Sequence, residues 1–191
     1  MTDLNDTFDA SNVFMRSAAS FDVWAASAAA LERSATVLWN VADEDLRGSH
    51  PPPWVFNPLM LLCALTVENL LKGLLVLKEP ALNVDGEFAH RSHDLTVLLT
   101  RADLNVTAKE ADLLERLATF LSWAGRYPIP LKHTNFATRR LETGQKVSTA
   151  YGTSSDRATW QDLLKKLRDS ANTLSLAHRR PTDVVADAAD S

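Results

Sequence analysis

The chain has 191 residues, of which 46% are hydrophobic and 23% charged, and its formal net charge is −4 at pH 7. These values are ordinary for one globular domain with a sizeable core, or for a domain with tails. The acidic balance excludes a protein that binds nucleic acid with its whole surface, although it allows a local basic groove.

The chain has a single cysteine, Cys63, so no intrachain disulfide can form. Its first residues are acidic and polar, and we expect no secretory signal peptide and a cytoplasmic location. The expected organisation is a disordered acidic lead over residues 1–10, one helical domain over 11–180 and a disordered acidic tail over 181–191.

An uninterrupted helix is predicted over residues 11–47. Two apolar series, each repeating every seven residues, run along it: Phe14, Phe21, Ala28, Ala35 and Ala42, and Trp24, Leu31 and Leu38. Small residues on one line and large residues on the other favour close packing against another helix. Gly48 and Pro51 end this long first helix.

The central helix is predicted over residues 59–78, LMLLCALTVENLLKGLLVLK, with Asn57 as N-cap and Pro58 in the first turn. Its leucines fall on every side, which is typical of a helix surrounded by other helices. The run is also about long enough to cross a membrane. Glu68 and Lys72 near its middle would each cost a few kcal/mol in lipid, so we favour a buried core helix and no membrane.

Glu68 and Lys72 are four residues apart with the acid first, which is the favourable order for a helical ion pair. Leucines surround them, so we expect a partly buried pair in which each charge needs the other.

Two further helices are predicted before residue 126. A short one covers residues 92–104. The next opens with a capping box formed by Thr107 and Glu110, carries a strong apolar stripe and ends at Gly125.

The helical pattern fails over residues 126–153, where Pro128 and Pro130 require an extended chain. A last helix is predicted over residues 155–180. The fold class is therefore an all-α bundle of about five helices.

The sequence contains none of the common catalytic or ligand-binding motifs: there is no Cys/His zinc spacing, glycine-rich phosphate loop or nucleophile elbow. Three segments do occur in a suggestive order. They are ALTVENLLKGLL from Ala64, His93-Asp94-Leu95 at a helix start, and WAGRYPIP from Trp123.

This succession resembles the HEPN superfamily over roughly residues 15–178. The resemblance implies a four- or five-helix bundle that pairs as a homodimer. Such domains occur in toxin–antitoxin, defence and nucleotidyltransferase-associated proteins, and many are metal-independent endoribonucleases. It therefore implies no metal and no cofactor, RNA or a nucleotide as ligand, and a cognate antitoxin or nucleotidyltransferase as partner.

The family's catalytic signature is an arginine, four to six residues and a histidine, and Arg126, YPIPLK and His133 match it. Histidine can accept a proton near neutral pH, and arginine can bind the phosphate oxygens through two N–H groups. Tyr127 follows the arginine, where active members usually have a polar residue. Other basic residues of this stretch could hold a phosphate backbone or be solvated surface charge: Lys132, Arg139, Arg140 and Lys146.

The resemblance also implies a polar cluster, because a histidine in the position of His93 often faces the Glu/Lys pair of the central helix. Glu68, Lys72, His93 and Arg126 would then meet inside the bundle, and we count Tyr127 with Glu68, Lys72 and His93 as a substrate-binding or polar group. The structural alternatives are that His93 caps or packs, that Arg126 bonds the last carbonyls of its helix, and that Tyr127 packs beneath the loop.

The other histidines, His50, His90 and His178, lie beside prolines, arginines or linkers, and we expect them to be solvated.

Three functions remain open from the sequence. The first is a HEPN-like domain that binds RNA or nucleotides or acts on them, in its most specific form as an endoribonuclease that uses Arg126 and His133. The second is a non-catalytic dimerisation or partner-binding module. The third is a pocket for a nucleotide or small anion that uses Lys72, His93 and Arg126.

Overall fold

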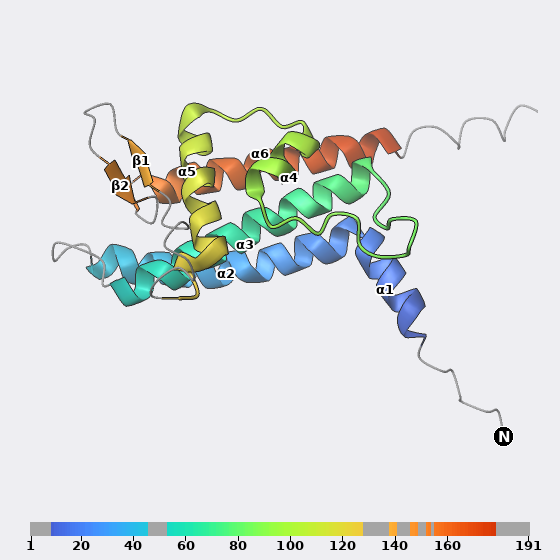
Figure 1. Cartoon of the computed structure of the whole chain (residues 1–191), viewed down its shortest axis with the longest axis horizontal. Helices are drawn as coiled ribbons and strands as arrows, with labels where there is room; N and C mark the ends of the chain where they lie inside the picture. Colours follow the sequence, from blue (N-terminus) through green and yellow to red (C-terminus); the bar gives the residue numbers. More distant parts are fainter. Residues whose placement is uncertain are drawn as a thin grey trace, which may run out of the picture.

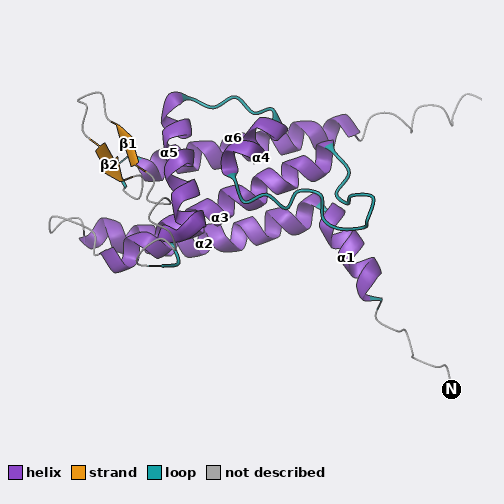
Figure 2. Ribbon diagram, in the orientation of Figure 1, coloured by secondary structure: helices purple, strands orange, loops and turns teal. Residues whose placement is uncertain are grey.

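The computed structural model of the chain describes residues 9–45, 53–127, 138–140, 146–148, 152–153 and 155–178. These ranges contain six α-helices, one π-helical turn and two short strands (Figures 1 and 2): α1 (Ala10–Ala19), α2 (Phe21–Asp45), α3 (Pro53–Lys78), α4 (Leu95–Ala102), α5 (Ala108–Thr119), η2 (Phe120–Ala124), β1 (Thr138–Arg140), β2 (Lys146–Ser148) and α6 (Asp156–His178). The predicted all-α bundle is confirmed. The antiparallel hairpin of β1 and β2 adds to it.

The central helix of the bundle is α3, as predicted. It contacts α1, α2, α4, α5, η2 and α6, and it runs beside α2 and α6 while α5 crosses in front of them (Figure 1). The stretch Val55–Lys78 is long and apolar enough to cross a membrane. Its most apolar 18 residues have a mean hydropathy of 1.8, but 72% of them are buried inside the bundle. Its leucines therefore have other helices as neighbours.

The predicted start of α3 is wrong, because the helix begins at Pro53 and not near residue 59. Asn57 is not its N-cap, and Pro58 lies inside it. Val55 is buried, and the ring of Phe56 meets Phe120 edge to face with centroids 5.5 Å apart. This packing outweighs the hydrogen bond that Pro58 cannot donate.

The predicted long first helix is two helices, divided at Ser20, whose backbone is extended. The indole N–H of Trp24 donates to the Ala18 carbonyl at 3.1 Å and so satisfies one of the carbonyls that the end of α1 exposes. Because of this break, the predicted apolar series does not form one continuous buried face: Ala28 of α2 is buried, whereas Phe14 of α1 is 47% exposed.

The outer boundaries differ from the predictions by little. Asp9 caps α1 and Ala10 begins it; residues 1–8 and the tail from 179 lie outside the described ranges. The helix predicted over 92–104 is shorter, Leu95–Ala102, because Asp94 caps it with bonds to two backbone N–H groups and Asp103 ends it in a left-handed conformation, φ 52°. The last helix begins at Asp156, next to the predicted residue 155.

The helix after residue 107 starts and ends where the sequence indicates. Both halves of the Thr107–Glu110 capping box are present, at 2.6 and 3.3 Å. Its last turn widens into the π-helix η2, closed by the bond from Gly125 N to the Phe120 carbonyl. Gly125 has an ordinary right-handed conformation, φ −79°. Glycine is needed there because a Cβ would lie 2.6 Å from the Cβ of Leu61 on α3.

Candidate functional site

Helix α3 and the loop before α4 meet at a buried carboxylate, that of Glu68. Its Oε1 accepts from Nζ of Lys72 at 2.6 Å and lies 2.9 Å from Nδ1 of His93. The side chains of Glu68 and Lys72 are 5% and 7% exposed, whereas that of His93 is 71% exposed. The predicted buried pair and its contact with His93 are both present. We name Glu68, Lys72 and His93 the Glu–His cluster.

The Glu–His cluster favours one tautomer of His93. A carboxylate at Nδ1 favours the tautomer with a proton on that nitrogen and leaves Nε2 to exchange a proton with a ligand. Lys72 offsets the charge of Glu68, so the carboxylate is not left alone in the core. The other oxygen, Oε2, is buried and has no hydrogen-bond partner within the described part of the chain.

A cavity of about 650 Å³ opens beside His93. Its walls come from the start of α4, from α5 and η2, and from the residues just after η2. Five of its lining residues carry the polar chemistry: His93, Asp94, Glu115, Ser122 and Arg126. This volume lies within the usual range for small-molecule sites, about 300–1,000 Å³.

Arg126 lines this cavity together with His93, so the structure brings these two predicted residues to one site. Its Nη2 donates to the Leu121 carbonyl at 2.6 Å, which confirms that it also satisfies the end of its helix. Within the described part of the chain it makes no bond to Glu68 or Lys72. The predicted cluster of four therefore holds three residues, and Arg126 lines the same cavity as His93.

The other half of the predicted arginine–histidine signature, His133, lies outside the described residues. Tyr127, the last described residue of this segment, is exposed, and its backbone N–H donates to the Trp123 carbonyl at 2.8 Å. Tyr127 is not among the residues that line the cavity, so the structure does not bring it to the site of His93 and Arg126.

The prediction that His90 is solvated is wrong, because the residue is wholly buried. Its Nδ1 lies 2.9 Å from Nη2 of Arg101 and 3.9 Å from the Glu79 carboxylate, and its ring meets Phe88 edge to face. Burial lowers the pKa of His90, and the positive charges of Arg101 and Lys72 lower it further, against an opposing effect of Glu79. His90 is therefore a neutral anchor for the loop before α4.

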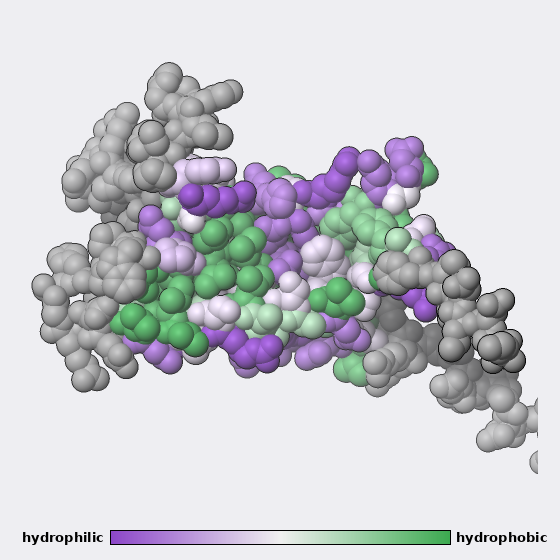
Figure 3. All heavy atoms as spheres, turned by 90° about the horizontal axis from the view of Figure 1, so that it is seen from below, coloured by the Kyte–Doolittle hydropathy of each residue, from purple (hydrophilic) through white to green (hydrophobic). Residues whose placement is uncertain are grey.

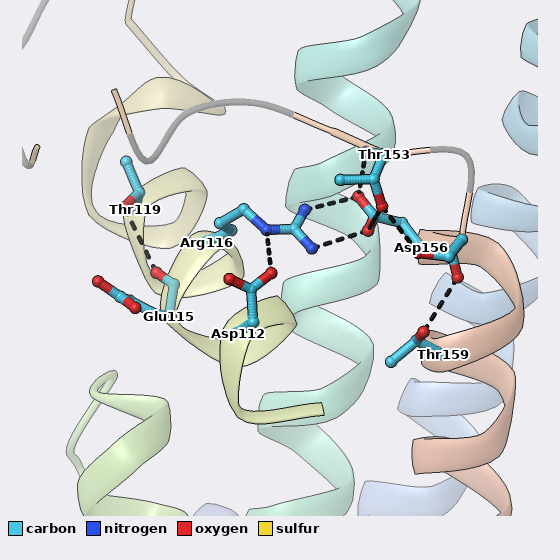
Figure 4. Close-up of polar contacts among 8 residues, drawn as sticks. Asp112, Glu115, Arg116, Thr119, Thr153, Asp156 and Thr159 are labelled. Carbon is cyan, nitrogen blue, oxygen red and sulfur yellow. Dashed lines mark hydrogen bonds and ion pairs between the residues drawn. The ribbon is translucent and has the colours of Figure 1, made fainter. Parts of the chain in front are cut away.

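A second buried ion pair was not predicted from the sequence. Arg116 of α5 binds both carboxylate oxygens of Asp156 at 2.6 and 2.7 Å, and its Nε donates to Asp112 at 3.0 Å (Figure 4). The backbone N–H of Thr153 also donates to Asp156, at 2.9 Å. A signal existed, because Arg116 interrupts the apolar stripe of its helix one turn after Leu113. The pair attaches the start of α6 to α5.

No group of three or more histidine, cysteine, aspartate or glutamate side chains comes together as a metal site within the ranges that the structure describes. Comparisons with protein-family models, with curated proteins and with solved structures find no match to this chain. The likeness to HEPN domains therefore stays an interpretation of the sequence motifs.

Proposed function

We propose that the chain is a HEPN-like domain that acts on RNA as a metal-independent endoribonuclease, in the cavity shared by His93 and Arg126. The observation that carries this proposal is the 2.9 Å contact between His93 Nδ1 and the buried Glu68 carboxylate. A histidine held in this way by an acid is typical of a group that transfers a proton during catalysis.

The chemistry needs three things from the protein. Without a metal, the 2′-hydroxyl of RNA attacks the neighbouring phosphorus, so one proton must be removed and another supplied to the leaving 5′-oxygen. Charge on the pentavalent phosphorane must also be stabilised. His93 transfers one of these protons. Arg126 has N–H groups beyond the one that binds Leu121, and it stabilises the phosphorane through them.

The test is cleavage of single-stranded RNA by the purified full chain in EDTA. We expect cleavage that falls about 100- to 10,000-fold in His93→Ala, falls strongly in Arg126→Ala and is unchanged in the exposed control Arg91→Ala. An oligonucleotide of the same sequence with 2′-deoxy sugars should not be cut, because it lacks the attacking 2′-hydroxyl. His133→Ala, measured in parallel, tests whether the sequence signature contributes a second histidine. No cleavage by the wild type, or equal cleavage by wild type and His93→Ala, would refute the proposal.

The biological setting belongs to the same proposal. A toxin–antitoxin or defence system, a cytoplasmic location and a cognate antitoxin or nucleotidyltransferase partner are what the HEPN resemblance implies. An adjacent antitoxin or nucleotidyltransferase gene, with growth arrest on expression that the neighbouring gene relieves, would support this setting. Growth unaffected by an RNA-cleaving protein would count against it.

A second candidate is a non-catalytic dimerisation or partner-binding module, and the apolar surface favours it. Phe14 on α1, which projects from the bundle, is 47% exposed (Figure 1), and Leu61, Leu62 and Leu65 of α3 are only half-buried. Figure 3 shows a broad apolar area toward the end of the molecule at which α2 ends and α3 begins. Both candidates predict a homodimer, so a monomeric mass in light scattering at micromolar concentration would count against each. A dimer without RNA cleavage would favour the second.

A further inference from the structure

We propose that Glu115 is the general base of the ribonuclease site. In this assignment its carboxylate takes the proton of the 2′-hydroxyl, and His93 gives a proton to the leaving 5′-oxygen. The inference rests on the proposed ribonuclease function and completes it, because cleavage needs two proton transfers in opposite directions and one histidine supplies only one of them at a time.

Glu115 lies on α5 and lines the cavity that His93 and Arg126 also line. Figure 4 shows its carboxylate projecting from α5 on the side opposite to the guanidinium of Arg116. Although Arg116 is the next residue, it is bound to Asp112 and Asp156 and does not neutralise Glu115.

Within the described part of the chain, the exposed Glu115 carboxylate takes part in no ion pair or side-chain hydrogen bond. Some other exposed carboxylates are engaged: Glu87, for example, pairs with Arg91 at 2.9 Å. An unpaired carboxylate keeps its lone pairs available to a ligand in the cavity.

The second carboxylate of the cavity, that of Asp94, is already used. Its Oδ1 accepts from the backbone N–H groups of Thr96 and Val97 at 2.9 and 3.2 Å and caps α4. Removing a proton from a substrate would compete with this cap. Glu115 has no such structural role, and we therefore assign the general base to Glu115 and not to Asp94.

The two roles follow from the neighbours of each group. A carboxylate without a partner can accept a proton, whereas the ring of His93, whose Nδ1 lies against the Glu68 carboxylate, has a second nitrogen, Nε2, from which a proton can be given. The 2′-oxygen, losing its proton to Glu115, forms a bond to phosphorus as the bond from phosphorus to the 5′-oxygen breaks. The 5′-oxygen then takes the proton from Nε2 of His93. The products are a 2′,3′-cyclic phosphate and a 5′-hydroxyl, and no other reactant is consumed.

The test uses the full chain and two RNA oligonucleotides, one normal and one with sulfur in place of the 5′-bridging oxygen. A thiolate leaves without being protonated, because a thiol is far more acidic than an alcohol. Loss of the acid is therefore rescued by the sulfur substrate, whereas loss of the base is not. The variants are Glu115→Gln, His93→Ala and the control Asp162→Asn, an exposed carboxylate of α6 that lines a different cavity. Binding is measured by fluorescence anisotropy with the 2′-deoxy analogue.

We expect Glu115→Gln to cut normal RNA about 100- to 10,000-fold more slowly than wild type, with unchanged binding and no rescue by sulfur. His93→Ala should be rescued, and Asp162→Asn should behave as wild type. Glu115→Gln as active as wild type, its rescue by sulfur, or a matching loss of binding would each overturn the assignment while leaving the ribonuclease proposal in place. A wild type that cuts neither oligonucleotide would overturn both.

Discussion

Replacing Lys72 by alanine should destabilise the protein strongly, because it leaves the Glu68 carboxylate buried without its closest partner. Nζ of Lys72 lies 2.6 Å from Oε1 of Glu68, and the two side chains are only 7% and 5% exposed. Breaking a buried ion pair by removing one partner costs about 3–5 kcal/mol. His93 still contacts Glu68 in the variant, so we expect the lower end, about 3 kcal/mol.

Thermal unfolding followed by circular dichroism measures this effect. For a protein of this size, 1 kcal/mol shifts Tm by about 2–4 °C, so Lys72→Ala should lower Tm by about 6–12 °C. The matched control is His93→Ala, which removes the exposed partner of the same carboxylate and should cost about 1 kcal/mol or less. The double variant Glu68→Leu/Lys72→Met removes both charges and should recover most of the loss.

A loss below about 1 kcal/mol in Lys72→Ala would refute the reasoning, since it would mean that water or another group compensates Glu68 at no cost. Equal losses in Lys72→Ala and His93→Ala would refute it as well, because the structure assigns them to buried and exposed positions.

Three other variants test the packing and the second charged cluster. Gly125→Ala should lower the free energy of unfolding by about 1–3 kcal/mol, because its methyl group would clash with Leu61. Adding Leu61→Ala to that variant should recover part of the loss. An unchanged free energy of unfolding for Gly125→Ala in a urea titration would contradict the close approach. Asp156→Asn should cost about 2–3 kcal/mol, because it weakens two bonds from Arg116, and an unchanged urea midpoint would argue against that pair. The pKa of His90 is lowered from its ordinary value of 6.5, so the unfolded chain binds a proton that the native state excludes. Stability should therefore fall as pH drops below 6.5, by up to about 1.4 kcal/mol per pH unit, and equal slopes in wild type and His90→Gln would contradict this.

The helices could be predicted where the local signals agree with the packing. The apolar run around Glu68 is a core helix, and the Thr107–Glu110 box begins α5. The errors lie where packing decides between competing local signals. Pro58 suggested a helix start, but the contact between Phe56 and Phe120 continues α3 back to Pro53. No glycine or proline marks the break at Ser20.

The candidate site could be predicted in part. The spacing of Glu68 and Lys72 gave their ion pair, and the resemblance gave the contact of His93 with Glu68. Glu115 was not found, because a glutamate on the polar side of an amphipathic helix has no distinguishing pattern. Only the three-dimensional fold shows that it lines one cavity with His93 and Arg126.

The π-helical turn η2 bears on how relatives of this chain should be aligned. A π turn holds one residue more than an α turn, and such turns arise as single-residue insertions into an α-helix. A relative without the extra residue would continue as a regular α-helix, and every later side chain would be rotated by about 100° around its axis. The residue facing the cavity would then stand one position away from Arg126 in an ungapped alignment. An arginine–histidine spacing counted across this turn should therefore be allowed to differ by one between relatives that share the same site.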